Sequence, residues 1–326
     1  MKLRLLPRSR WAQVLLGLII LLLLPYVVSR IASPWRCVRI FSETSDKPSL
    51  STTCTIRVVS YNIAHGRGLA DSNWNGGSPE KRLERLEQIA QLLKKLDADV
   101  VVLNEVDFDS SWSSAVNQAE YLARKADYPY RVEQRNYDFR VLGWKWRFGN
   151  AVLSRYPIQK AQVVPFPGYS RWETLLAGKK QGLFCTIDGP TEPFSVLAAH
   201  LSYRSESLRV QSAKMIVELT KDQNRPLLLA GDLNSTPPGY PQACQDNHGE
   251  NAITCLDTSQ LFKRLPNKPP TPEQLTFSSS QPQTVIDWIM APTTWNFENY
   301  QAIDSRLSDH RPVMAIIGRT ANRPPE

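Results

Sequence analysis

From residue 56 onward, short runs of apolar and β-branched residues alternate with segments of helical periodicity. Residues 56–63 have the sequence IRVVSYNI, typical of a buried strand, and apolar residues then recur every three or four positions from Leu83 to Leu96, as on one face of a helix. Further strands are expected at 100–103, 151–154, 182–187, 194–200, 226–231, 285–290 and 312–317, and further helices at 117–126 and 205–221. This alternation predicts an α/β domain with sheets inside and helices outside.

Side chains that ionise or donate hydrogen bonds stand at the ends of these apolar runs. They are Asn62, Glu105, His200, Asp232, Asn234, Asp287, Asp309 and His310. A carboxylate buried beside an apolar strand is costly unless a cation or a network of donors compensates it. The repeated position therefore indicates one shared site at the strand ends, where open α/β sheets bind ligands.

The residue types at this expected site define a chemistry. Glu105 and Asp309 offer hard oxygen ligands suited to Mg²⁺. Asp232 can accept a proton from attacking water, and Asp287 can hold the tautomer of His310. The donors for phosphoryl oxygens are Asn62, Asn234, His200 and His310. The set is that of a hydrolytic phosphoryl-transfer site, where positioning and electrostatics provide most of the catalysis.

Seven motifs occur in a fixed order along the chain: SYNIAHG, LNEVD, GNAVLSRYPI, AAHL, GDLNS, IDWI and SDHRP. With them, residues 56–318 resemble the endonuclease/exonuclease/phosphatase superfamily. The resemblance implies an α/β fold, a four-layered α/β sandwich with two central mixed β-sheets flanked by helices. It also implies Mg²⁺ as the cofactor, with Mn²⁺ as a substitute.

The resemblance assigns a role to each matched residue. It places the metal at Glu105, with Asn62 close by, and Asp309 either at the metal or in support of the adjacent His310. Asp232 activates or orients the water, and Asp287 orients the ring of His310. The residues that stabilise the pentacovalent phosphorane are His310, Asn234 and His200. Asn150, in the GNAVLSR motif, corresponds to a position beside the substrate.

The expected reaction is divalent-metal-dependent hydrolysis of a phosphoester, with a phosphodiester favoured. A DNA or RNA endonuclease or exonuclease is the first alternative, and a sphingomyelinase-like or phospholipid phosphodiesterase is the second. An inactive binding module is disfavoured because the ligands, the base and the phosphate donors are all present. The partner is then a phosphoester in a lipid head group, a nucleic acid or a small phosphodiester; a monomer is expected, and no protein partner is inferred.

Charge gives only weak guidance on the substrate. Lys and Arg number 39 against 31 Asp and Glu, but residues 1–39 hold seven of the basic residues and no acidic one. The remainder of the chain is nearly neutral, so a broad basic surface for nucleic acid is not expected. Local clustering of basic residues along a groove stays open.

The N-terminal segment is a nearly unbroken apolar run, from Trp11 to Val28, behind four basic residues. Its 18 residues are just enough to cross a bilayer core of roughly 30 Å. We expect residues 1–28 to be an uncleaved membrane anchor, with a cleaved signal sequence and a secreted protein as the alternative. Residues 29–55 are expected to be a stalk, 56–318 the catalytic domain and 319–326 a tail, with the domain on the extracytoplasmic side, periplasmic or extracellular.

All five cysteines follow the apolar run. Cys37 with Cys54 would close a loop in the stalk, and Cys244 with Cys255 would close an insertion, while Cys185 lies in an apolar segment. Two disulfides and one buried thiol fit an oxidising compartment. Unrelated buried cysteines are the alternative.

Two groups near the expected site have both a functional and a structural interpretation. Arg204 can bind a second phosphate through its guanidinium or lie on the surface. Trp144, Trp146 and Phe148 can form a lip for a base or a lipid chain or close a core. His65, near Asn62 in a glycine-flanked loop, can touch the substrate.

Overall fold

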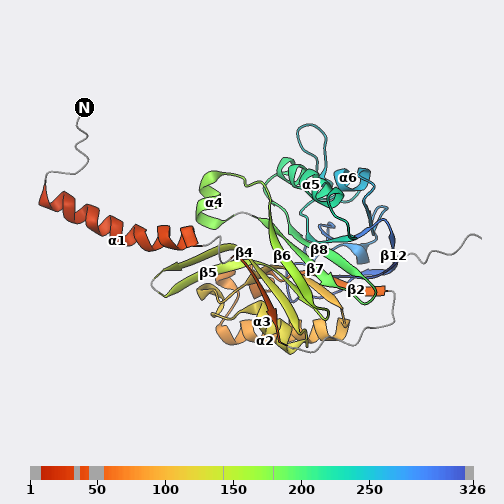
Figure 1. Ribbon diagram of the computed structural model, residues 1–326, viewed down its shortest axis with the longest axis horizontal. Coiled ribbons are helices and arrows are strands. Elements are labelled where there is room, and N and C mark those ends of the chain that lie inside the picture. Colours follow the sequence, from red (N-terminus) through yellow and green to blue (C-terminus); the bar gives the residue numbers. More distant parts are fainter. Residues whose placement is uncertain (1–8, 33–36, 44–54, 142, 179, 320–326) are drawn as a thin grey trace, which may run out of the picture.

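The computed structural model describes residues 9–32, 37–43, 55–141, 143–178 and 180–319. Within them, two β-sheets pack face to face and helices cover the outer face of each (Figure 1). The first sheet has the strand order β1 (Val38–Ser42), β4 (Tyr130–Val141), β5 (Trp144–Ser154), β3 (Val100–Asp107), β2 (Thr55–Asn62), β13 (Val313–Arg319) and β12 (Trp295–Ala302). The second has the order β10 (Phe262–Arg264), β11 (Asp287–Pro292), β9 (Leu227–Asp232), β8 (Pro193–His200), β7 (Gln181–Asp188) and β6 (Ile158–Pro165).

The helices are α1 (Arg10–Ala32), α2 (Pro79–Leu96), α3 (Gln118–Lys125), α4 (Arg171–Ala177), α5 (Glu206–Lys221) and α6 (Ala252–Thr258). Side chains of Asn117 and Ser205 accept backbone N–H bonds at the first turns of α3 and α5, which is why these helices begin where the sequence indicates. Helix α6, in the insertion after β9, was not expected. Residues 137–141 and 143–148, for which the sequence analysis expected no element, form the free end of the β4–β5 hairpin.

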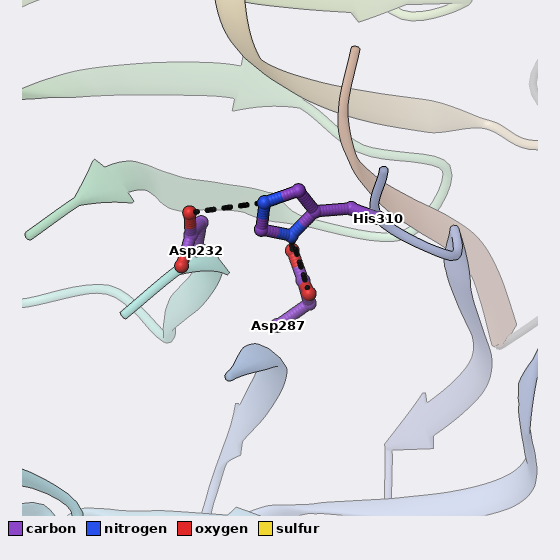
Figure 2. A group of neighbouring side chains, drawn as sticks. All are labelled: Asp232, Asp287 and His310. Atoms are coloured by element: carbon purple, nitrogen blue, oxygen red, sulfur yellow. Dashed lines mark hydrogen bonds and ion pairs between the residues drawn. The ribbon is translucent and has the colours of Figure 1, made fainter. Parts of the chain in front are cut away.

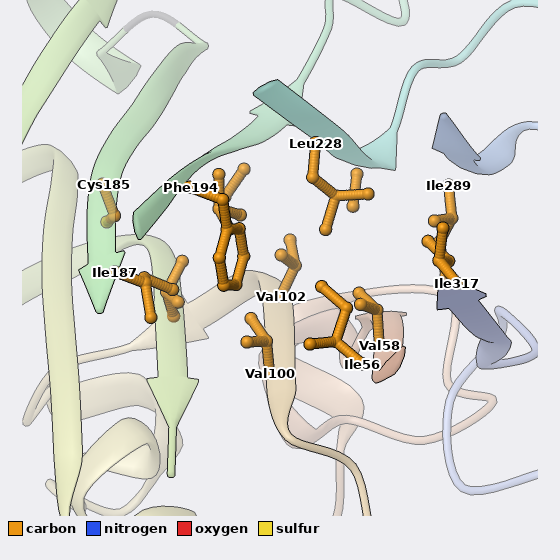
Figure 3. Packing of buried hydrophobic residues seen from close by; sticks show 14 of the residues in the cluster. Ile56, Val58, Val100, Val102, Cys185, Ile187, Phe194, Leu228, Ile289 and Ile317 are labelled. Carbon is orange, nitrogen blue, oxygen red and sulfur yellow. The ribbon is translucent and has the colours of Figure 1, made fainter. Parts of the chain in front are cut away.

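Three hydrophobic cores separate the layers and confirm the four-layered α/β sandwich. Between the sheets, Val58, Val102, Phe194 and Leu228 lie in one buried cluster (Figure 3). The neighbouring residues of the same strands point outward and pack against α2 and α3 on one side and α5 and α6 on the other. Both faces of the central strands are thus buried, so the strands are apolar at nearly every position.

Each sheet contains one parallel strand pair, β2–β3 in the first and β8–β9 in the second. The last paired residues are Asn62 with Asn104 in the first pair and His200 with Asp232 in the second. Asp287, at the start of β11, pairs antiparallel with Asp232. The carboxyl ends of both pairs therefore deliver their polar side chains to one region between the sheets.

Part of the segment that was expected to be a stalk lies in the first sheet. Residues 38–42 form the edge strand β1, which pairs antiparallel with β4, while residues 44–54 lie outside the described part. Helix α1 has 23 residues and spans about 35 Å at a rise of about 1.5 Å per residue. Its segment Arg10–Ser29 is apolar and long enough to cross a membrane, a property that signal sequences share.

The predicted Cys244–Cys255 disulfide is not formed, because both residues are free thiols. The Cys244 thiol donates to Glu206 Oε2 across 3.0 Å, and burial together with that carboxylate raises the pKa of the thiol. Cys185 is fully buried in β7, as the sequence indicated. The other predicted pair includes Cys54, which lies outside the described residues.

Candidate active site

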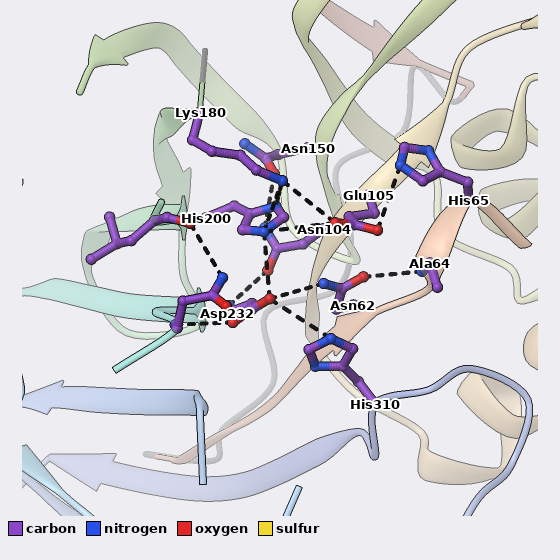
Figure 4. Close-up of polar contacts among 12 residues, drawn as sticks. Asn62, Ala64, His65, Asn104, Glu105, Asn150, Lys180, His200, Asp232 and His310 are labelled. Carbon is purple, nitrogen blue, oxygen red and sulfur yellow. Dashed lines mark hydrogen bonds and ion pairs between the residues drawn. The ribbon is translucent and has the colours of Figure 1, made fainter. Parts of the chain in front are cut away.

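Asp232 lies at the centre of the polar cluster between the sheets (Figure 4). It ends β9 directly after Gly231, which has a φ of 142° and where a Cβ atom would lie 1.8 Å from Ala199 O, so only glycine fits there. One oxygen of Asp232, Oδ2, accepts from Asn62 Nδ2 at 3.0 Å and lies 3.4 Å from His200 Nε2. The structure therefore brings together residues from three strands that are far apart in sequence.

His310 faces Asp232 from the opposite side and is held by Asp287 (Figure 2). Its Nδ1 lies 2.9 Å from Asp287 Oδ2, and its Nε2 lies 3.8 Å from Asp232 Oδ2. Burial alone would lower the pKa of His310, but the two carboxylates outweigh it and raise the pKa to about 10. Burial also raises the pKa of Asp232, to about 7, although the imidazolium opposes this shift. His310 is thus a cation at neutral pH, with a proton on each ring nitrogen.

Glu105 sits in a β-bulge of β3 with a φ of 52°, which turns its side chain toward the site. Its carboxylate lies 3.4 Å from Lys180 Nζ, 3.4 Å from Arg67 and 3.5 Å from His65 Nε2. Burial would raise the pKa of Glu105, but Lys180 and the neighbouring histidines and arginine hold it well below its usual range. Glu105 is an anion that faces the cations Lys180 and Arg67.

Asp309 shares a cation with Glu105. Arg67 bonds to Asp309 Oδ2 at 2.5 Å and to Glu105 Oε2 at 3.4 Å, so one guanidinium spans the two carboxylates. Both carboxylates are partly open to solvent, with side-chain exposures of 21% for Glu105 and 22% for Asp309. Two accessible oxygen ligands that already face a common positive charge fit a divalent ion.

A second group with the spacing of metal ligands consists of Asp232, Asp287 and His310, whose ligand atoms lie within 4.8 Å of one another. All three side chains are buried. His310 lies between the two carboxylates and one of its ring nitrogens faces each of them, so the three side chains already interact with one another. The carboxylates of Glu105 and Asp309 are therefore the better candidate for the metal side of the site.

A model of the Endonuclease/Exonuclease/phosphatase family matches residues 59–310. The chain belongs to this family. Members of the family are phosphoester hydrolases and generally use divalent metal ions. A search of curated proteins gave no match.

Solved structures of this family share the fold. An endonuclease/exonuclease/phosphatase from Beutenbergia cavernae DSM 12333 is 21% identical, with a TM-score of 0.60 over 82% of this chain and 72% of that chain. A mannosyl-6-phosphatase from Bacteroides thetaiotaomicron VPI-5482 is 16% identical, with a TM-score of 0.57 over 80% and 99%. The human Nocturnin catalytic domain with bound sulfate is 16% identical, with a TM-score of 0.57 over 85% and 100%. Because these sequence identities are low, the similarity to these structures establishes the shared fold alone.

The backbone of Asp232 is fixed by a relay of buried amides that the sequence did not reveal. Asn104 Oδ1 accepts from Asp232 N at 2.9 Å, and Asn104 Nδ2 donates to Asn150 Oδ1 at 2.8 Å. Asn150 in turn donates to Gln134 at 2.8 Å and to the carbonyl of Gln181 at 2.9 Å. Asn150 was expected beside the substrate. In the structure it is fully buried, and both polar atoms of its side chain are hydrogen-bonded within the protein, so it holds Asn104 in position.

Asn62 and Asn234 also make bonds within the protein. Asn62 Oδ1 accepts from Ala64 N at 3.0 Å, which leaves its Nδ2 directed at Asp232. Asn234 has a φ of 50°, its N–H donates to Asp232 Oδ1 at 3.0 Å, and its Nδ2 donates to Leu201 O at 3.2 Å. The side-chain amide of Asn62 and the backbone N–H of Asn234 therefore hold the carboxylate of Asp232 in place.

Lys180 and Arg67 are two cations that the sequence analysis missed. Lys180 Nζ lies 3.0 and 3.2 Å from the two ring nitrogens of His200 and contacts Glu105. Burial lowers the pKa of His200 well below its usual range, and Lys180 adds to the shift, so His200 is neutral. Both cations come from loops with no strand or helix pattern, and no motif identified them.

His65 belongs to a layer behind Glu105. Its Nδ1 lies 2.8 Å from the fully buried Asp107, which also accepts from Trp112 Nε1 at 2.6 Å. Asp107 therefore orients His65 from a buried position. His65 reaches the site through Glu105.

Beside Lys180 lies a pocket of about 180 Å³, here called the α4 pocket. Its wall includes Asn136, Phe148, Tyr169, Glu173, Lys180 and Tyr203. Arg204 stands outside this lining, with its guanidinium over the rings of Tyr203 and Tyr169 at 4.7 and 5.5 Å and 3.4 Å from Glu173. The structure thus places Arg204 against three wall residues of the pocket rather than in contact with the catalytic cluster.

Proposed function

We propose that the chain hydrolyses a phosphodiester with the help of a divalent metal ion, Mg²⁺ or Mn²⁺. The observation that supports this best is the position of Asp232, whose Oδ2 lies near Asn62, His200 and His310 at 3.0, 3.4 and 3.8 Å. A carboxylate with a pKa raised to about 7, next to an imidazolium, is suited to take a proton from water at neutral pH.

In this proposal Asp232 accepts the proton of the attacking water, and its orientation depends on Asn62 and on the Asn104 amide. The imidazolium of His310 donates to a phosphoryl oxygen as negative charge develops there. Asp287 keeps that ring charged and oriented. His200, and Asn234 after a change of its present bond to Leu201, would add further donors to the phosphorane.

Glu105 and Asp309 would hold the metal ion, with the amide of Asn62 nearby. A bound divalent ion polarises the phosphoryl group and offsets the charge of the transition state. Arg67, which now spans the two carboxylates, would have to release at least one of them. We further propose that α1 anchors the protein in a membrane, with the catalytic domain on the extracytoplasmic side.

The test uses the purified full chain and the soluble diester bis(p-nitrophenyl) phosphate. Turnover that requires Mg²⁺ or Mn²⁺ and disappears in Asp232→Asn is the expected result. Met215→Ser, an exposed change on α5, serves as the matched control and should retain wild-type turnover. Absence of turnover by folded wild type in either metal would contradict the proposal, and nicking of supercoiled plasmid would redirect it to a nuclease.

A further inference from the structure

Helix α1 docks on the catalytic domain at one defined place, the β4–β5 hairpin. Ser29, the last residue of the apolar span, accepts from Arg140 N at 3.0 Å and donates to Asp138 O at 3.5 Å. The ring of Tyr26 lies 5.4 Å from that of Phe139. Because the apolar span ends at this contact, a bilayer crossed by α1 would have its surface next to the hairpin.

The end of the molecule that faces this surface carries exposed aromatic residues. Trp144 begins β5 at the hairpin tip and is 56% exposed, and Trp172 on α4 is 74% exposed. The free end of the hairpin and α4 both lie at the end of the domain where α1 arrives (Figure 1). Tryptophan is enriched where proteins meet the polar boundary of a bilayer.

A series of ring contacts runs along the hairpin from α1 to the α4 pocket. Phe139, which touches Tyr26, lies 6.2 Å from Tyr137, and Tyr137 lies 5.8 Å from Phe148. Phe148 lines the α4 pocket and also contacts His65 at 5.4 Å. A row of aromatic rings in contact thus connects the docked end of α1 with the wall of the pocket.

Lys180 lines the α4 pocket. The same side chain contacts both Glu105 and His200 (Figure 4), so the pocket adjoins the proposed reacting groups. Tyr169 and Tyr203, two other wall residues, are 60% and 58% exposed. The wall of the pocket therefore combines exposed aromatic rings with the ammonium group of Lys180 and the carboxylate of Glu173. This combination suits a molecule with an apolar part and a phosphate.

We propose that the substrate is a membrane phospholipid, whose phosphodiester enters through the α4 pocket while α1 holds the β4–β5 hairpin against the bilayer. The inference rests on the proposed function and names its substrate class. Water adds its oxygen to phosphorus, one P–O ester bond breaks, and the leaving oxygen takes a proton. The products are one phosphomonoester and one alcohol.

The experiment reconstitutes the full chain in vesicles of phosphatidylcholine, phosphatidylethanolamine, phosphatidylglycerol and sphingomyelin with Mg²⁺. Phosphomonoester release from the lipids and hydrolysis of added bis(p-nitrophenyl) phosphate are measured in the same sample. We expect both reactions in the wild type and neither in Asp232→Asn. Hydrolysis of the soluble diester without any lipid turnover would overturn the lipid inference and leave the proposed function standing, whereas loss of both reactions in the folded wild type would overturn the two together.

The docking contact is tested with Tyr26→Ala combined with Ser29→Ala. The ratio of lipid to soluble-diester turnover should fall by about tenfold, because the domain can then turn away from the bilayer. The matched control on the same helix combines Val27→Ala with Val28→Ala, two residues that are 45% and 55% exposed, and should keep the wild-type ratio. Trp144→Ser should lower the ratio as well. An unchanged ratio in the docking variant would overturn the role of the hairpin.

Discussion

Two acidic clusters lie in the candidate site, and their negative charges are compensated in different ways. In the first, Asp232 and Asp287 are buried and enclose the protonated ring of His310. In the second, Glu105 and Asp309 are partly exposed and share a guanidinium from a loop. The first cluster carries its own cation in fixed geometry, whereas the second holds one that a small ion can replace.

The difference suits the two clusters to two tasks of the proposed reaction, proton transfer and metal binding. A buried, hydrogen-bonded group keeps its position without a ligand, which suits proton transfer and donation to phosphate. Carboxylates open to solvent can exchange their partners, which suits a metal that arrives with its own water. We therefore propose that the proton chemistry belongs to the Asp232 cluster and the metal to the Glu105 cluster.

The largest effect is expected from Asp232→Asn. The amide keeps the shape of the side chain but cannot accept the proton, so kcat should fall by about 10³-fold. Steady-state kinetics with bis(p-nitrophenyl) phosphate measures the loss, and thermal unfolding serves as the check on folding. A loss below about fivefold would remove Asp232 from the proton transfer.

Asp287→Asn should have the next largest effect. It removes the charge that keeps His310 an imidazolium, while an oxygen for the hydrogen bond is retained, so kcat should fall by about a hundredfold. The metal concentration at half-maximal rate should stay within about twofold of the wild type, because the change lies in the other cluster. A large shift in that metal concentration would contradict the proposal that the metal and the proton transfer belong to different clusters.

Asn104→Ala tests the amide relay that supports the first cluster. The buried N–H of Asp232 and the amide of Asn150 would each lose a partner, which should cost about 1–3 kcal/mol in the free energy of unfolding. Denaturant titration measures this cost. Asn136→Ala, on β4 of the same sheet but without a bond to Asp232, offers a comparison variant. Equal stability of Asn104→Ala and wild type would show that the relay is not needed.

The smallest effect is expected from Arg67→Gln. Without the guanidinium, a metal ion has no competitor for Glu105 and Asp309, so the concentration of Mg²⁺ at half-maximal rate should fall by about two- to fivefold. A metal titration of the rate measures this shift. A higher requirement for Mg²⁺ in the variant would mean that Arg67 assists binding instead.

The sequence predicted the fold and the central residues because strand ends and helix caps are local signals. Apolar runs that end at Asn62 and Asp232 are enough to place those side chains at the carboxyl ends of their strands. Glu105 and Asn104 show the limit, since strand alternation would send these neighbours to opposite faces and only the bulge at Glu105 lets both reach the site. Arg67 and Lys180 act from loops, where no periodicity indicates which cation will meet a carboxylate.

The most direct test of the account is calorimetric titration of Mn²⁺ into the full chain and two variants. We predict that wild type and Asp287→Asn bind the ion with similar affinity and that Glu105→Gln loses binding. Loss of binding in Asp287→Asn with retention in Glu105→Gln would place the metal in the buried cluster of Asp232, Asp287 and His310 and contradict the assignment.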